Sequence, residues 1–207
     1  DMRTSVASTL VRDRDVIACP GRLDHSKGQD VVIRALARLK TANLAPKVRF
    51  IGGGRQLDAY QALAEELDVS EQCVFVGAVP HAEMYREMAA AALTIVPSRS
   101  EAFGLVNVES MSVSTPVIAS AVGGIPEIIR DGVDGFLVPP DDPEALAEKI
   151  KLLLSDPTLR EQMGKNARQR FLDVFEQTRS IEQQVLWFEN LVRSEERRVG
   201  KECRSRW

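Results

Sequence analysis

The chain has 207 residues, of which 44% are hydrophobic and 28% charged, a composition that supports one buried core and excludes a disordered or fibrous protein. Its 27 basic and 30 acidic residues leave a net charge of −3, without the positive excess that non-specific binding of nucleic acid requires. The longest apolar run, residues 88–96, is about half the ~20 residues of a membrane-spanning helix, and the first residues lack the apolar core of a signal peptide. We therefore expect no nucleic-acid partner and no transmembrane segment.

Short β-branched runs alternate with helical patterns along most of the chain. In chain order the pattern predicts strand 16–19, helix 30–41, strand 48–51, helix 56–67, strand 74–76, helix 82–91, strand 93–96, helix 105–112, strand 117–120, helix 126–131, strand 136–138 and helix 143–154. Strands that alternate with helices of this length form right-handed βαβ units. The fold class is therefore α/β, a doubly wound parallel sheet of about six strands flanked by helices, with the helical residues 157–192 packed outside the sheet.

The two ends of the chain are set apart from this domain of residues 16–192. Residues 1–15 are polar and without period, which is typical of a linker from something upstream. Residues 193–207, with six basic and three acidic side chains, match the translation of a sequencing-adapter read-through, and we expect a non-native tail; a disordered basic tail is the alternative. The three cysteines are far apart with no CxxC pair, which favours the cytoplasm and predicts no metal site.

A loop with two glycines and two cations follows the first predicted strand. It contains Gly21, Arg22, Lys27 and Gly28 and leads into a helix. An arginine fork, a lysine charge and free amides at a helix N-terminus together bind phosphate oxygens, so the loop is a candidate diphosphate site. Taken alone, the same residues are equally typical of a solvated turn. The glycines at 52–54 lack the GxGxxG spacing and are more typical of a tight turn.

A second group of candidate residues follows the fourth predicted strand. Glu101 lies in the loop and Glu109 about one turn into the next helix, so both can face one pocket. The amides of Phe103, Gly104 and Leu105 lie at the helix N-terminus, where an anion is favoured. A carboxylate beside an anion site accepts hydrogen bonds from sugar hydroxyls. Two solvated surface glutamates are the alternative for this segment in isolation.

Together these motifs resemble the family 4 retaining glycosyltransferases. The resemblance covers residues 16–192 and rests on several motifs in matching order: Gly21-Arg22-Leu23 with Lys27-Gly28, the E-x7-E spacing of Glu101 and Glu109, Pro116-Val117-Ile118-Ala119, Gly123-Gly124-Ile125-Pro126-Glu127, Gly132 and Gly135. It implies the C-terminal, Rossmann-like half of a GT-B fold, with a missing N-terminal Rossmann-like domain that supplies the acceptor site.

The resemblance also implies a role for each site residue. Arg22 and Lys27 would bind the donor diphosphate and stabilise it as it leaves, with Gly21 beside them. Glu101 would contact the sugar hydroxyls and Glu109 the ribose hydroxyls. The amides at Phe103, Gly104 and Leu105 would bind the sugar and distal phosphate, and the loop 77–80, which includes Val79, the base. The family needs no metal or other cofactor besides its nucleoside-diphosphate sugar, and its acceptors are sugars, lipid-linked sugars or others. Neither His25 nor His81 matches a catalytic position of the family, and both are interpreted as ordinary loop histidines.

The expected function is transfer of a hexose-type sugar with retained configuration, in the cytoplasm or at the inner membrane face, although this half alone is expected to bind the donor without transfer. Three alternatives stay open: a non-catalytic nucleotide-sugar-binding module, an epimerase or phosphorylase of the same fold, and a purely structural domain. One departure from the family concerns stability: Ser114 stands where the family has glycine, and a positive φ there would cost on the order of 1 kcal/mol.

Overall fold

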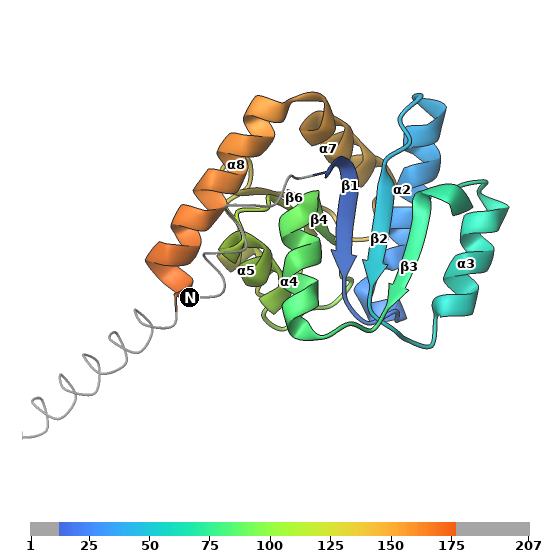
Figure 1. Ribbon diagram of the computed structural model, residues 1–207, viewed down its shortest axis with the longest axis horizontal. Helices are drawn as coiled ribbons and strands as arrows, with labels where there is room; N and C mark the ends of the chain where they lie inside the picture. Colours follow the sequence, from blue (N-terminus) through green and yellow to red (C-terminus); the bar gives the residue numbers. More distant parts are fainter. Residues whose placement is uncertain (1–12, 177–207) are drawn as a thin grey trace, which may run out of the picture. The chain divides into compact units, whose positions relative to one another are not determined.

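The computed structural model describes residues 13–176 of the chain, and within them six strands form one parallel sheet (Figure 1). The strands stand in the order β3-β2-β1-β4-β5-β6, which is the order of a doubly wound Rossmann-like sheet. All six predicted strands are confirmed, with ends that differ by up to three residues. Their bounds are β1 (Asp13–Pro20), β2 (Lys47–Ile51), β3 (Cys73–Gly77), β4 (Ala91–Val96), β5 (Val117–Ser120) and β6 (Gly135–Val138).

The helices follow the strands in the predicted alternation. They are α2 (Gln29–Thr41), α3 (Leu57–Glu66), α4 (His81–Ala90), α5 (Leu105–Ser112), α6 (Ile125–Ile128), α7 (Pro143–Ser155) and α8 (Pro157–Arg170), with short 3₁₀ turns η1 (His25–Lys27) and η2 (Ser70–Gln72). The helix predicted over 126–131 begins one residue earlier, and it ends three residues earlier than predicted. Ile129 is already extended, and Asp131 forms a bridge to Gly135, so β-structure takes over after one helical turn.

Alternate residues of β1 point to opposite faces of the sheet, and both faces are buried. Ile17 and Cys19 belong to the large core that includes side chains of α2, α3 and α7, whereas Ala18 packs with Met88 and Ala89 of α4. A strand covered on both faces has a continuous apolar sequence rather than an alternating one, which is why the central strands were recognisable as short apolar runs.

The chain changes direction between β1 and β4, and this fixes where a ligand can bind. From β1 the strands proceed to β2 and β3 on one side, and from β4 to β5 and β6 on the other. In sheets of this kind the loops after the two central strands diverge, and ligands occupy the crevice at their carboxyl ends. The loops after β1 and β4 hold the predicted Arg22, Lys27 and Glu101.

Ser114 adopts the strained backbone that its position predicts. It follows α5 with φ 61°, in the left-handed region that favours glycine. A Cβ on Gly164 of α8 would collide with the carbonyl oxygen of Ser114, so α8 approaches this turn closely. The serine therefore occupies a turn whose backbone conformation favours glycine.

The described residues fall into two units, of which the second begins at Phe171. Within that second unit the structure describes one π-helix, Phe171–Phe175, closed by a hydrogen bond from the amide of Glu176 to the carbonyl of Phe171. The predicted linker over 1–12, the helical pattern beyond 176 and the predicted tail 193–207 lie outside the described residues.

Candidate functional site

The loop between β1 and α2 is held in a fixed shape by its own backbone and by a neighbouring loop. The Asp24 carboxylate accepts hydrogen bonds from the amide (2.8 Å) and the hydroxyl (2.6 Å) of Ser26, which starts the turn η1, and these bonds lower the pKa of Asp24. Gly28 then begins α2 with φ 67°, and a Cβ there would collide with the carbonyl oxygen of Pro97. Glycine at 28 therefore lets the loop after β1 contact the loop after β4.

Lys27 and Glu101 meet across these two loops. Lys27 Nζ lies 2.6 Å from Glu101 Oε2, and the two side chains are only 26% and 18% exposed. The Ser98 hydroxyl lies 3.5 Å from the same carboxylate oxygen. Gly123, with φ 52°, packs closely against the same loop, and any larger residue there would place its Cβ on the carbonyl oxygen of Glu101. The predicted diphosphate lysine and sugar-binding carboxylate thus lie side by side.

Arg22 is the exposed cation of the site. Its side chain is 76% exposed, and its guanidinium reaches Asp24 at only 3.8 Å. Its backbone is fixed, since the buried Gln29 donates a hydrogen bond to the carbonyl of Arg22 at 2.9 Å. The adjoining Gly21 donates its amide to the carbonyl of Ile51. An anchored backbone with an extended, weakly paired side chain leaves the guanidinium able to turn toward an anion.

The N-terminus of α5 lies next to Glu101. Gly104 caps the helix with φ 96°, no side chain caps it, and the Glu101 side chain would be 3.5 Å from a Cβ on Gly104. The first amides of a helix have no partner within the helix and carry its positive dipole end. Phe103 and Leu105 on either side are exposed. The predicted anion-binding amides therefore adjoin the Lys27–Glu101 pair.

Glu109, one turn further along α5, has a different partner. Its Oε1 accepts a hydrogen bond from His81 Nε2 at 2.6 Å, and the side chains of Glu109 and His81 are 12% and 64% exposed. The interpretation of His81 as a loop residue was wrong, because it is the first residue of α4. Its ring also makes an edge contact with Tyr85, with centroids 4.9 Å apart.

The loop after β3, predicted to contact the base, directly precedes His81. Gly77 has φ 82°, and the partly buried Val79 packs on the apolar cluster between β1 and α4. Ala78 and Pro80 are exposed. The Val79 side chain is therefore turned toward the protein, which leaves the loop backbone and its neighbours for any contact with a ligand.

Arg99 joins both loops and was given no role in the sequence analysis. Its guanidinium donates to both carboxylate oxygens of Asp30, at 2.8 and 2.7 Å, to Asp141 at 2.6 Å and to the carbonyl of His25 at 2.7 Å. Its amide donates to the carbonyl of Ser26 at 2.8 Å. These bonds tie the loop after β4 to the turn that carries Lys27. The signal in the sequence was an arginine directly after a buried strand.

Arg99 and Asp30, which we call the Arg99 clamp, shift each other's pKa. The hydrogen bond to Asp30 raises the pKa of Arg99 above its ordinary value. Burial raises the pKa of Asp30, but the hydrogen bonds and charge of Arg99 outweigh it, so the pKa of Asp30 is lowered overall. Both groups remain ionised at neutral pH, and the clamp is an ion pair throughout the physiological range.

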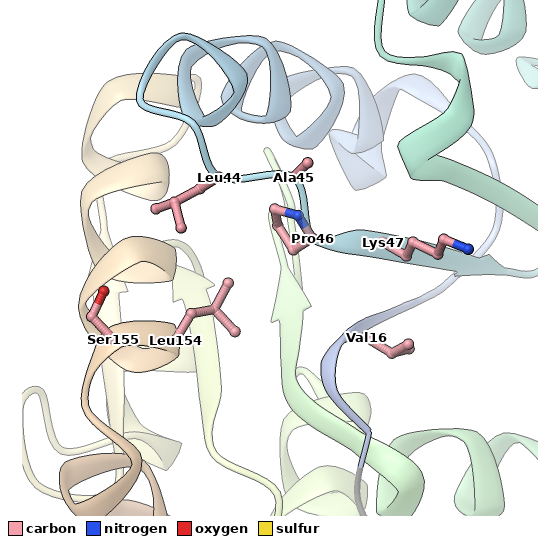
Figure 2. A pocket seen from close by; sticks show the side chains of 7 residues that line it. All are labelled: Val16, Leu44, Ala45, Pro46, Lys47, Leu154 and Ser155. Atoms are coloured by element: carbon pink, nitrogen blue, oxygen red, sulfur yellow. The ribbon is translucent and has the colours of Figure 1, made fainter.

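A separate cavity lies at the opposite end of the strands, where they begin. It has a volume of about 690 Å³ and is found at the start of β1 and β2, beside the end of α7 (Figure 2). Its lining is mainly aliphatic and contains none of the predicted site residues: Val16, Leu44, Ala45, Pro46, Lys47, Leu154 and Ser155. This cavity is therefore distinct from the candidate site at the carboxyl ends of β1 and β4.

Residues 13–176 contain neither a long apolar helix nor a cluster of metal-binding side chains. No helix in this part of the chain is long and apolar enough to cross a membrane. Within the same residues, His, Cys, Asp and Glu side chains form no group of three or more that could hold a metal ion.

Known proteins with similar sequences are glycosyltransferases. The sequence matches the family described as "Glycosyl transferases group 1" over residues 3–170. The D-inositol 3-phosphate glycosyltransferase of Thermobifida fusca is 37% identical over 164 residues, which cover 75% of this chain and 38% of that protein. The chain thus spans well under half the length of this curated relative.

Solved structures show the same relationship. Sucrose-phosphate synthase from Thermosynechococcus elongatus has a TM-score of 0.79 and 31% identity, over 94% of this chain and 49% of that one. Anabaena HepE, solved with UDP and glucose, has a TM-score of 0.75 and 25% identity, over 91% and 50%. The C-terminal domain of LpcC, a glycosyl transferase group 1 family protein from Francisella tularensis, has a TM-score of 0.72 and 26% identity, over 86% and 94%.

The Rossmann-like sheet, the motifs on its two central loops and the sequence match over most of the chain agree with one another. This chain belongs to the group 1 glycosyltransferases, whose fold is GT-B.

Proposed function

We propose that this chain is the donor-binding half of a retaining glycosyltransferase, which transfers a hexose from a nucleoside-diphosphate sugar to an acceptor bound mainly by a second, N-terminal domain. The observation that carries the proposal is the cluster at the carboxyl ends of β1 and β4. There Lys27, Glu101 and the α5 N-terminus gather where doubly wound sheets bind ligands, and Glu109 lies one turn further along α5. The likeness to an isolated C-terminal domain over 94% of its length supports the assignment to that half.

The diphosphate of the donor requires positive charge. Lys27, the exposed guanidinium of Arg22 and the amides at Gly104 and Leu105 can supply it. When the bond between the sugar C1 and the diphosphate breaks, negative charge grows on the departing phosphate oxygens. Positive groups already in place stabilise that charge without reorganisation, which lowers the barrier. This is the role we assign to Arg22 and Lys27.

The two carboxylates suit neutral hydroxyls, which donate hydrogen bonds that a carboxylate accepts. Glu101 lies beside Lys27, so a sugar attached to the distal phosphate would reach it, and we assign it the sugar hydroxyls. Glu109 lies one turn deeper along α5, beside the residue that follows the loop after β3, and we assign it the ribose. The loop 77–80 with Val79 would then adjoin the base, and HepE, solved with UDP and glucose, supports a nucleotide donor of this type.

Ligand-dependent unfolding of the full chain tests the proposal. UDP, GDP and ADP, each alone and as its glucose or mannose conjugate, would be added at about 100 times Kd, where a ligand of the native state adds roughly 2.7 kcal/mol and raises Tm by several degrees. We expect one nucleotide to stabilise the protein. Lys27→Ala should abolish this stabilisation, whereas Lys47→Ala, at the opposite, amino-terminal end of the strands, should keep it. A folded protein that none of these ligands stabilises would contradict it.

Transfer itself distinguishes the enzyme from a non-catalytic sugar-nucleotide-binding module. The two readings bind the same donor, so the protein extended by its upstream sequence must be assayed for a product. A product whose anomeric carbon keeps the donor's configuration supports the proposal. Donor binding without hydrolysis or transfer in that extended protein would favour the binding module.

A further inference from the structure

The bond between His81 and Glu109 joins an exposed ring to a nearly buried carboxylate. Glu109 is 12% exposed and His81 64%, and Nε2 lies 2.6 Å from Oε1. Among the hydrogen bonds and ion pairs of the described residues, this one is the single contact that engages the Glu109 carboxylate. The second oxygen, Oε2, is therefore left for another donor.

The fold brings His81 to this place from another part of the sheet. It begins α4 directly after the loop that follows β3, the edge strand of the β1 side, and α4 packs against both β1 and α5 (Figure 1). Pro80 precedes it with an extended backbone, and the edge contact with Tyr85 restricts the ring. The imidazole thus lies between the loop assigned to the base and the carboxylate assigned to the ribose.

We propose that His81 is a positioning residue that orients Glu109 for the two hydroxyls of a ribose, and so makes the site select ribonucleotides over 2′-deoxyribonucleotides. This inference rests on the proposed function, which supplies the nucleotide. A carboxylate oxygen can only accept, so Nε2–H is the donor, and it fixes the rotation of the carboxylate. Oε2 and the remaining lone pair of Oε1 then face a pair of adjacent hydroxyls in one orientation.

Without the hydrogen bond from His81, the Glu109 side chain is less restricted in its rotamers. Ordering it on binding costs conformational entropy, whereas a carboxylate held in place before the ligand arrives avoids that cost. The cost falls on the ribose hydroxyls alone, because Glu109 touches neither Lys27 nor Glu101 in the described contacts. His81 is 64% exposed, so its removal opens no cavity in the core and should leave the fold intact.

Calorimetric titration of the full chain with matched nucleotide pairs tests this inference. UDP, GDP and ADP are compared with dUDP, dGDP and dADP for the wild type, His81→Ala, His81→Gln and Glu109→Gln. Arg86→Ala is the matched control, because Arg86 is exposed on the same helix and pairs with Glu83 of that helix. Thermal unfolding of each variant without ligand verifies the fold.

We expect the wild type to bind the preferred ribonucleotide about tenfold or more tightly than its deoxy form, as the loss of one charge-assisted hydrogen bond implies. His81→Ala should lower that ratio by about threefold or more, because the deoxynucleotide, which keeps only the 3′ hydroxyl, should lose less affinity than the ribonucleotide. His81→Gln, whose amide still donates, should restore part of the ratio, and Arg86→Ala should keep all of it. The ratio in Glu109→Gln should fall as well.

Two contrary outcomes are separable. If His81→Ala weakens the ribonucleotide and the deoxynucleotide equally, or weakens neither, the inference is overturned while the proposed function stands. If the folded wild type binds none of the six nucleotides, the proposed function fails and the inference fails with it.

Discussion

Lys27 and Glu101 form a 2.6 Å ion pair that joins the loop after β1 to the loop after β4. Within the described contacts, the cation assigned to the diphosphate is thus held by the carboxylate assigned to the sugar. Glu101 repels a diphosphate, and Lys27 offsets that repulsion. A donor with its sugar in place gives each group a partner of its own.

This pairing predicts opposite effects for its two members on the binding of a nucleoside diphosphate without sugar. Lys27→Ala should weaken it about tenfold or more, because a charge-assisted contact is lost and the charge of Glu101 is unopposed. Glu101→Gln should leave it equal or tighter, and should remove most of any preference for the sugar conjugate. Calorimetric titration measures both. Equal weakening by the two variants would show that Glu101 does not oppose the diphosphate.

The Arg99 clamp predicts a coupled loss of stability and binding. Arg99→Ala leaves Asp30 partly buried without its bidentate partner and releases the turn that carries Lys27, so the free energy of unfolding should fall by about 2 kcal/mol. Arg99→Lys should recover little, because an ammonium cannot form the two-pronged contact. Urea unfolding measures the change.

A double variant tests whether the cost comes from the unpaired carboxylate. Arg99→Ala with Asp30→Ala should cost less than the sum of the single changes, since residues in one ion pair are not additive. Strict additivity would mean that Arg99 acts through Asp141 and the backbone carbonyls instead.

The sequence predicted the sheet and the two central loops because those features are local. A short apolar run marks a buried strand. Glycine and a charged residue after that run, such as Lys27 after the first strand or Glu101 after the fourth, mark a loop at the carboxyl end of the strand. The contacts of Arg99 with Asp30 and of His81 with Glu109 were not predictable in this way, because each joins segments that only the packing of the sheet brings together. The rotation of α4 against α5 decides whether His81 reaches Glu109, and no periodicity within either helix encodes it.

The shortened α6 has a similar cause. Ile129 is buried like Ile128, but its backbone is already extended, so the chain leaves the helix between these two residues. The β-bridge between Asp131 and Gly135 then holds the backbone extended where the helix was predicted to continue. The residue at which the helix ends therefore depends on tertiary contacts that no local pattern in the sequence marks.

The pH dependence of stability should include a step from Asp30. Its pKa is lower in the folded protein than the ordinary value of about 3.9, because Arg99 outweighs the effect of burial. At acid pH the unfolded chain therefore binds more protons, so this contribution is complete above about pH 5 and is lost as the pH falls through the unfolded and then the folded pKa. Asp30→Asn should be less stable than the wild type at pH 7.

The same comparison at low pH supplies the control. The difference in unfolding free energy between wild type and Asp30→Asn should shrink between pH 5 and the acid limit of the fold. Some dependence should remain in the variant, because hydrogen bonds from Ser26 also lower the pKa of Asp24. A difference that stays constant down to acid pH would mean that Asp30 titrates alike in the folded and unfolded chain.

Ser114 predicts a stabilising substitution outside the site. Its φ of 61° costs a residue with a Cβ about 1–2 kcal/mol, and glycine avoids that cost but loses about 0.5–1 kcal/mol of backbone entropy on folding. Ser114→Gly should therefore raise the free energy of unfolding by about 0.5–1 kcal/mol, and Ser114→Val should lower it. Ser155→Gly, at the exposed last residue of α7, is the control for a serine without a positive φ and should not stabilise the protein. Urea unfolding of the three variants measures the differences, and a loss of stability in Ser114→Gly would show that the serine side chain contributes more to the turn than the strained φ costs.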